Sequence, residues 1–295
     1  MITDALIRAL PKTDLHVHLD GSSRIPTLIE LARDGGVRLP SETEEGLREM
    51  VFKPAYQSLV EYLAGFEFTV AALQSREALE RTAYELGCDN IEEGVRYIEV
   101  RFAPHLHMHD GLHFDDVIAS VVKGLDRARV EHEQSDAVRV DGEPPFRFGI
   151  IVCAMRAFGA QSGEWYARLM RQFPETPRKH IYRMASLELA RAAVRCRDEL
   201  DMPIVAFDLA GQEDGFPARD HAEAYQYAHR HFLKKTVHAG EAYGPESIFE
   251  AITELHADRI GHGYHLFSPE LCGPKIGSPQ DYVGRLARYL SLIHI

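Results

Sequence analysis

Three features that are scarce or missing narrow the classes of protein to which this chain can belong. Only four cysteines occur among 295 residues, and no Cys-x-x-Cys pair is present, which predicts reduced thiols in a cytoplasmic protein. The N-terminal segment has no long apolar run, so neither a signal peptide nor a membrane partner is expected. Lysine and arginine number 33 against 45 acidic residues, and this net charge of −12 argues against nucleic acid as a partner.

Histidine is the residue that is present in surplus. The chain has 16 histidines, an ordinary hydrophobic fraction of 45% and enough length for one large domain or two small ones. Histidine is a common metal ligand, but a surplus alone is weak evidence for metal chemistry. The spacing of the histidines therefore decides whether a metal site is predicted.

The segment from Thr13 to Gly21 carries the first candidate site. Its alternation of apolar and polar residues predicts a short strand, in which His16 and His18 project from the same face. Asp20 lies two residues after His18, so it continues the same alternation, and Gly21 marks a turn. Two imidazoles beside a carboxylate suit a metal ion such as zinc, although a His-x-His pair can also be a polar strand end that only makes hydrogen bonds.

Strands and helices alternate along the chain, which predicts a parallel sheet. The later strands are expected at residues 95–102, 147–154, 203–208, 235–238 and 258–262. The polar residues that stand at strand ends are His16, His18, Asp208, His238 and His262. This arrangement is typical of a (β/α)8 barrel, or TIM barrel, whose site lies at the C-terminal ends of its strands. A doubly wound open sheet is the alternative, but the glycine-rich phosphate loop that usually follows its first strand is missing.

An apolar stripe at helical spacing runs between residues 59 and 73. Its members are Leu59, Tyr62, Leu63, Phe66, Val70 and Leu73. The stripe is expected on one helix, where it either faces the core or forms a lid whose aromatic side chains cover a flat apolar ligand.

Four histidines alternate in the segment that follows the strand predicted at 95–102. They are His105, His107, His109 and His113, in a segment that also contains glycine and aspartate. No cysteine or suitable carboxylate completes an obvious ligand set with them, so we expect solvated side chains that bind no metal.

Five blocks of sequence, taken together and in this order, resemble the adenosine deaminase family of metal-dependent hydrolases. They are Asp14–Gly21, Glu99–His105, Asp208–Gly211, His238–Glu241 and Arg259–Tyr264. The resemblance extends from about Leu10 to Leu271, and it implies a TIM barrel of the metal-dependent hydrolase type. Five collinear blocks are far more specific than any one of them.

The resemblance implies one zinc ion per chain. His16, His18 and His238 match the family's zinc-binding histidines. A bound zinc ion lowers the pKa of its water from about 15.7 to about 7, which makes hydroxide available at neutral pH. Binuclear relatives commonly carry a bridging lysine on the fourth strand, whereas the corresponding residues here, Asp208 to Gly211, include no lysine.

The same resemblance implies the other roles in the site. Glu241 matches the residue that protonates the purine ring, and His262 matches the residue that orients the attacking water or accepts its proton. Asp20 and Gly211 match positions that contact ribose and purine, and His18 also lies near the substrate in the family. The simpler alternatives are a helix cap for Glu241, a core histidine for His262 and a turn residue for Asp20.

The reaction that the resemblance implies is hydrolytic deamination of adenosine, and of 2′-deoxyadenosine, to the inosine product and ammonia in purine salvage. The expected partner is therefore a small purine nucleoside, with adenine or an N6-substituted adenosine phosphate as alternatives. An inactive fragment or pseudoenzyme is the alternative outside this class. A deaminase of the cytidine type is excluded, because His221-Ala222-Glu223 has no Cys-x-x-Cys partner. The sequence leaves the oligomeric state open.

The C-terminal part departs from the family pattern. The family has two more strands, the last ending in an Asp-Asp pair, whereas here the last aspartate is Asp281, a helix is expected over 284–290, and 291–295 match no family motif. We therefore expect residues 1–295 to form one adenosine deaminase-like catalytic domain with about six of the eight strands, lacking strands seven and eight. Because unpaired edges and apolar surface would be exposed, this chain alone is expected to aggregate or fold partly and to have at most trace activity.

Overall fold

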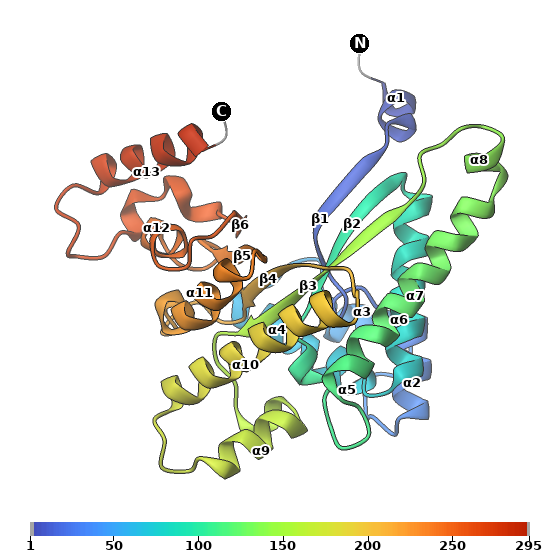
Figure 1. The fold of residues 1–295 in the computed structure, drawn as a ribbon, viewed down its shortest axis with the longest axis horizontal. Helices are drawn as coiled ribbons and strands as arrows, with labels where there is room; N and C mark the ends of the chain where they lie inside the picture. Colours follow the sequence, from blue (N-terminus) through green and yellow to red (C-terminus); the bar gives the residue numbers. More distant parts are fainter. Residues whose placement is uncertain (1–2, 294–295) are drawn as a thin grey trace. The chain divides into compact units, whose positions relative to one another are not determined.

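Six strands in sequence order form the sheet of the computed structural model, which describes residues 3–293 (Figure 1). Within these residues the strands are β1 (Lys12–His18), β2 (Val95–Phe102), β3 (Arg147–Met155), β4 (Ile204–Ala210), β5 (Lys234–Ala239) and β6 (Arg259–His262). Consecutive strands are neighbours, and helices lie in the connections between them, as in a (β/α)8-type fold. The alternation of strands and helices predicted from the sequence is thus confirmed.

The helices carry ordinary capping signals at several of their starts. Over the described part of the chain they are α1 (Asp4–Ala9), α2 (Ile25–Asp34), α3 (Glu44–Met50), α4 (Leu59–Ala64), α5 (Phe66–Ala72), α6 (Arg76–Glu92), α7 (Phe114–Gln134), α8 (Asp136–Arg139), α9 (Glu164–Gln172), α10 (Arg178–Glu199), α11 (Ala222–Arg230), α12 (Pro245–Thr253) and α13 (Pro279–Ile293). The side chains of Thr43, Ser58 and Ser75 accept hydrogen bonds from the first turns of α3, α4 and α6. None of these helices combines the length and apolar character that a bilayer crossing requires.

The chain divides into two compact units, which are described separately. The first comprises Met1–Ile151, Ala160–Arg168 and Cys196–Val205, and the second comprises Val152–Gly159, Leu169–Arg195 and Ala206–Ile295. Strands β3 and β4 each begin in the first unit and continue in the second. The single catalytic domain expected for residues 1–295 stays a prediction.

In the first unit, β1 pairs in parallel with β2, with Thr13 opposite Tyr97. The register shifts between Asp14 and Val17, where Asp14 Oδ1 accepts a hydrogen bond of 2.9 Å from the backbone N–H of His16. Most of β2 is buried, as expected for a strand covered on both faces. The pairing therefore holds the end of β1, which carries the His-x-His motif, against a buried strand.

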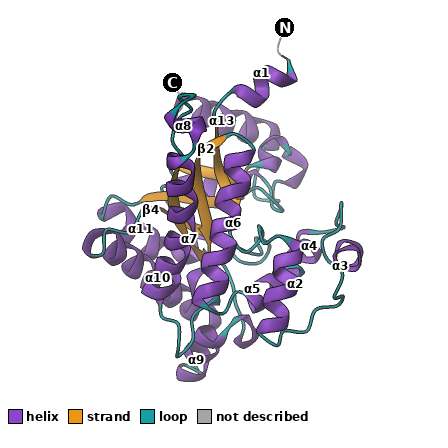
Figure 2. Ribbon diagram, turned by 90° about the vertical axis from the view of Figure 1, so that its right-hand side faces the viewer, coloured by secondary structure: helices purple, strands orange, loops and turns teal. Residues whose placement is uncertain are grey.

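Helices α6 and α7 lie side by side in the first unit (Figure 2). Glycines allow their close approach. A Cβ at Gly124 would lie 2.2 Å from the Glu80 carbonyl oxygen, and a Cβ at Gly87 would lie 2.8 Å from the Ala128 Cβ. Gly124→Ala is therefore expected to lower the free energy of unfolding by about 1–3 kcal/mol, the usual cost of overpacking.

Denaturant titration of Gly124→Ala beside Gly277→Ala measures this effect. A Cβ at Gly277 would meet nothing within 4 Å, so the second variant controls for the added methyl group alone. Equal free energies of unfolding for the two variants would contradict the close packing of α6 on α7.

In the second unit, β5 lies between β4 and β6 and is parallel to both. Ala239 lies opposite His262, so the residue after His238 is level with the end of β6. At the other end of β5, the buried Lys235 places its Nζ 2.7 Å from Asp258 Oδ2, just before β6. The register therefore brings the two histidines to the same end of the sheet.

Four segments differ from the sequence-based expectations. The stripe over 59–73 forms two short helices, because Gly65, a weak helix former, ends α4 and precedes α5. Helix α3 was not expected, since its sequence is mostly polar and acidic, and no helix was expected over α9. Helix α13 contains the helix expected over 284–290 and extends it in both directions. Of the tail segment 291–295, residues 294 and 295 lie outside the described residues.

Candidate active site

The carboxyl end of β1, in the first unit, carries two histidines and a buried carboxyl group. The ring centroids of His16 and His18 lie 5.4 Å apart, so the two imidazoles are neighbours. Asp20 is only 5% exposed, and burial raises its pKa to about 7, against the opposing effect of hydrogen bonds from backbone N–H groups. A carboxyl group buried in this way is more typical of a binding site than of a solvated turn.

A small cavity beside Asp20 has a wall of aromatic side chains. Its volume is about 50 Å³, and its lining includes Tyr56, Tyr62 and Phe66. The Tyr62 and Phe66 ring centroids lie 5.5 Å apart, and the Phe66 centroid lies 6.2 Å from that of His18. Most of the stripe over 59–73 is only half-buried, and Tyr62 is 42% exposed, which favours the lid over the core-facing alternative.

Two of the four histidines that follow β2 correct the expectation of solvated side chains, whereas His113 is exposed as expected. His105 lies in the 3-10 helix η1 (Pro104–Leu106) and stacks on Trp165 at a centroid distance of 3.6 Å. His107 Nδ1 lies 2.9 Å from the Leu73 carbonyl oxygen. Burial lowers the pKa of His105 to about 3 and that of His107 to about 4, so both rings are neutral. Trp165 and Leu73 belong to other segments of the chain, so the burial of these histidines could not be predicted from the local sequence.

In the second unit, two buried side chains lie near the ends of adjacent strands. His238 Nδ1, near the end of β5, lies 2.9 Å from Asp208 Oδ2 on β4. Both side chains are almost completely inaccessible to solvent, at 5% and 0% exposed. A carboxylate beside Nδ1 orients the imidazole and directs Nε2 toward a metal ion or substrate.

Glu241 and His262 lie beside this buried pair. Glu241 Oε1 is 3.5 Å from His262 Nε2, and the His262 ring centroid is 5.2 Å from that of His238. Burial raises the pKa of Glu241, so its protonated form persists to higher pH than in a solvated glutamate. His262 has a φ of +64°, an unusual conformation that costs a non-glycine residue on the order of 1–3 kcal/mol. Such strain concentrates at functional sites.

Gly211 directly follows β4, and its backbone explains why glycine is found there. Its φ of +97° lies in the region that favours glycine, and a Cβ would lie 3.2 Å from Met155 Cε. The backbone can therefore pass close to a neighbouring group at this point. The purine contact implied for Gly211 stays a prediction.

Two charged residues that were absent from the sequence-based predictions hold the end of β5 and the loop that follows it. The Glu213 carboxylate accepts hydrogen bonds from the backbone N–H groups of Gly240–Tyr243. Arg156, 1% exposed, donates a hydrogen bond of 2.7 Å from Nη2 to the His238 carbonyl oxygen. In the sequence, Glu213 is distinguished only by its position two residues after Gly211. Acidic residues are common in loops, so this position did not identify it as functional.

The strand order and the histidines and acids at the strand ends are those of a TIM-barrel metal-dependent hydrolase. The sequence model of the adenosine deaminase family matches residues 11–177 and 151–272, and the chain belongs to this family. The solved structure of an Arabidopsis N6-mAMP deaminase is similar, with 26% identity and a TM-score of 0.63 over 88% of this chain and 67% of that one. The fold class predicted from the sequence is thereby confirmed.

Curated relatives are similar over most of this chain. An adenosine deaminase of Vibrio atlanticus is 34% identical over 258 residues, which are 88% of this chain and 66% of the relative. An adenosine deaminase of Mycobacterium leprae is 39% identical over 263 residues, which are 88% of this chain and 63% of the relative. The chain thus spans slightly less than two thirds of the length of these relatives.

Proposed function

We propose that the protein is a metal-dependent hydrolase that removes the 6-amino group of adenosine, and of 2′-deoxyadenosine, as ammonia. One observation carries the proposal: Glu241 and His262 lie 3.5 Å apart beside the buried pair of His238 and Asp208. This places a carboxyl group of raised pKa next to an imidazole at the carboxyl ends of the strands. Membership of the adenosine deaminase family supports the same reaction.

The proposed cofactor is one zinc ion, held by His16, His18 and His238. Each of these histidines lies at or near the carboxyl end of its strand, β1 or β5, and offers one ring nitrogen. Neutral imidazoles are ligands that zinc favours. The contact of His238 Nδ1 with Asp208 Oδ2 fits this role, because it leaves the other ring nitrogen as the ligand. When bound, zinc supplies a water whose pKa is near about 7.

In the proposed chemistry, Glu241 and His262 carry out the proton transfers. As water adds to the carbon that bears the amino group, the adjacent ring nitrogen gains a proton, which Glu241 donates. His262 orients the water or accepts its proton. The amino group then takes up from His262 the proton that the water released, the carbon–nitrogen bond breaks, and ammonia leaves. As the carbonyl group forms, the new hydroxyl group returns a proton to the Glu241 carboxylate. The raised pKa of Glu241 suits the donor, because it keeps the carboxyl protonated to higher pH.

The proposed substrate is a purine nucleoside. The aromatic rings of Tyr62 and Phe66 can cover a flat base, and the Asp20 carboxyl group beside them can hydrogen-bond ribose hydroxyls. His18 and Gly211 are the other proposed substrate contacts. A nucleotide is a second candidate, because the similar Arabidopsis protein is an N6-mAMP deaminase.

The test uses the natural full-length protein, purified in the presence of zinc. Ammonia release is measured with adenosine, 2′-deoxyadenosine, adenine and N6-methyl-AMP as substrates. We expect adenosine and 2′-deoxyadenosine to be deaminated with higher kcat/KM than adenine or N6-methyl-AMP. A preference for N6-methyl-AMP would move the substrate class to nucleotides. No ammonia from any of the four would overturn the proposed deaminase function and favour a pseudoenzyme.

A further inference from the structure

The carboxylate of Glu213, which follows β4, accepts hydrogen bonds from the loop after β5. The backbone N–H groups that donate to it, at 2.8–3.2 Å, belong to Gly240, Glu241, Ala242 and Tyr243. The Ser247 hydroxyl donates a further hydrogen bond to the same carboxylate. One side chain therefore satisfies four consecutive backbone donors, which would otherwise need water.

Glu213 is well placed to hold this loop firmly. Its side chain is buried, with 6% exposed. Although burial raises the pKa of Glu213, hydrogen bonds from Ser247 and from the loop's N–H groups hold that pKa below its usual value, so the carboxylate is ionised. Hydrogen bonds to an ionised acceptor are roughly twice as strong as those between neutral groups.

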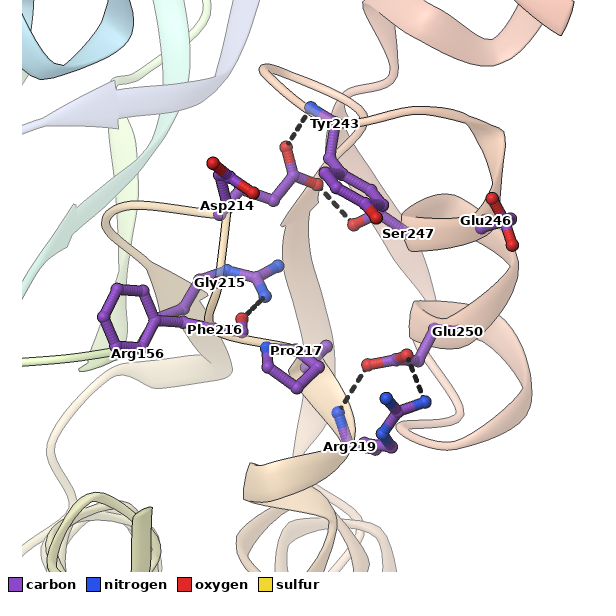
Figure 3. Close-up of a pocket in the computed structure, with 12 residues that line it drawn as sticks. Arg156, Asp214, Gly215, Phe216, Pro217, Arg219, Tyr243, Glu246, Ser247 and Glu250 are labelled. Atoms are coloured by element: carbon purple, nitrogen blue, oxygen red, sulfur yellow. Dashed lines mark hydrogen bonds and ion pairs between the residues drawn. The ribbon is translucent and has the colours of Figure 1, made fainter. Parts of the chain in front are cut away.

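Arg156 supplies a second anchor on the same segment. Its Nη2 donates to the His238 carbonyl oxygen at 2.7 Å. Its Nη1 donates to the Phe216 carbonyl oxygen at 2.8 Å, as Figure 3 shows. Phe216 belongs to the loop that also carries Glu213. The β4 loop and Arg156 therefore fix the segment that runs from His238 to Tyr243 at both of its ends.

A simple helix cap does not account for these contacts. Helix α12 begins at Pro245, and the four backbone N–H groups bound by Glu213 all precede it. A capping side chain binds N–H groups within the first turn of its helix. Only the Ser247 hydroxyl comes from α12. The carboxylate is thus directed mainly at the residues around Glu241.

We propose that Glu213 is a positioning residue, which fixes the backbone of Glu241 so that its carboxyl group meets the purine ring beside His262. The inference rests on the proposed function, and Glu213 itself touches no reacting group. Displacement of a catalytic group by about 1 Å can lower a rate on the order of 10²-fold.

Glu213→Gln tests the proposal, because the amide keeps the size but turns an N–H₂ group toward backbone donors. We expect kcat to fall about 10–100-fold, with KM changed less than about threefold and zinc content unchanged. Amide hydrogen exchange at residues 240–243 should accelerate in the same variant. Glu213→Asp, which keeps the charge but is shorter, should have an intermediate kcat.

Glu250→Gln is the matched control. Glu250 lines the same cavity of about 360 Å³ as Glu213, but it accepts its hydrogen bonds from Arg219 (Figure 3). We expect this variant to keep the wild-type kcat and the wild-type exchange at residues 240–243.

The outcomes separate this inference from the proposed function. An active wild-type enzyme whose Glu213→Gln variant keeps kcat would overturn the positioning role, even if the variant is less stable. If Glu213→Gln does not fold, a wild-type kcat in Glu213→Asp would overturn it in the same way. An inactive wild-type protein would overturn the proposed function, while hydrogen exchange would still report whether Glu213 holds the loop.

Discussion

Glu241→Gln is expected to lower kcat by about 10²–10⁴-fold, the usual contribution of general acid catalysis, while zinc stays bound. The amide has the size of the carboxyl group but cannot deliver a proton to the purine ring. Ammonia release and zinc content, measured on the same samples, check both parts of the prediction. Glu254→Gln, which changes an exposed acid at the end of α12, is the control and should behave as wild type.

The pH dependence of the wild-type enzyme provides a second measurement on Glu241. Burial raises the pKa of Glu241, and the acid form is the active one, so kcat should fall as pH rises through that pKa. This alkaline decline should be missing from the residual activity of Glu241→Gln. Near-normal turnover in a variant replete with zinc would reduce Glu241 to a cap of the following helix.

His238→Ala is expected to abolish zinc binding at equilibrium and, with it, deamination. Removing one of three imidazole ligands leaves two, fewer than a stable tetrahedral site normally uses. Elemental analysis after dialysis should find about one zinc ion per wild-type chain and a small fraction of that in the variant. Added zinc should raise the thermal unfolding midpoint of the wild type, because it binds the folded state, but should leave that of the variant unchanged.

His229→Ala is the control for that experiment. His229 is exposed on α11, so its loss removes an imidazole without touching the proposed ligands. Retention of one tightly bound zinc ion by His238→Ala would contradict the assignment of His238 as a ligand. Loss of zinc from His229→Ala would show that the assay responds to any lost histidine.

Local patterns were sufficient to predict the strands and the residues at their ends. Alternation and apolar runs give β1 to β6 within a few residues, because a strand's side-chain period is a property of its own sequence. The family motifs implied roles for Glu241 and His262 in one site, and the structure places Glu241 Oε1 3.5 Å from His262 Nε2. Their catalytic roles, like the zinc-ligand roles of the three histidines, remain proposals.

Features that depend on contacts between distant segments could not be predicted. The burial of His105 requires Trp165, which lies sixty residues further along the chain (165 − 105 = 60). Glu213 looks like an ordinary loop acid until the backbone of residues 240–243 is seen around it. The break at Gly65 depends on a small difference in helix propensity that an apolar stripe conceals.

The order of the sheet has a consequence for how the chain is made. Within residues 3–293, each strand after β1 lies beside the strand that was synthesised before it, so its neighbour has already been made when it leaves the ribosome. His238 is translated 222 residues after His16 (238 − 16 = 222), which takes roughly 11–44 s at about 5–20 residues per second. During that interval the nascent chain contains His16 and His18 but not yet His238, the third proposed ligand. Metal acquisition through all three histidines must therefore follow the emergence of β5.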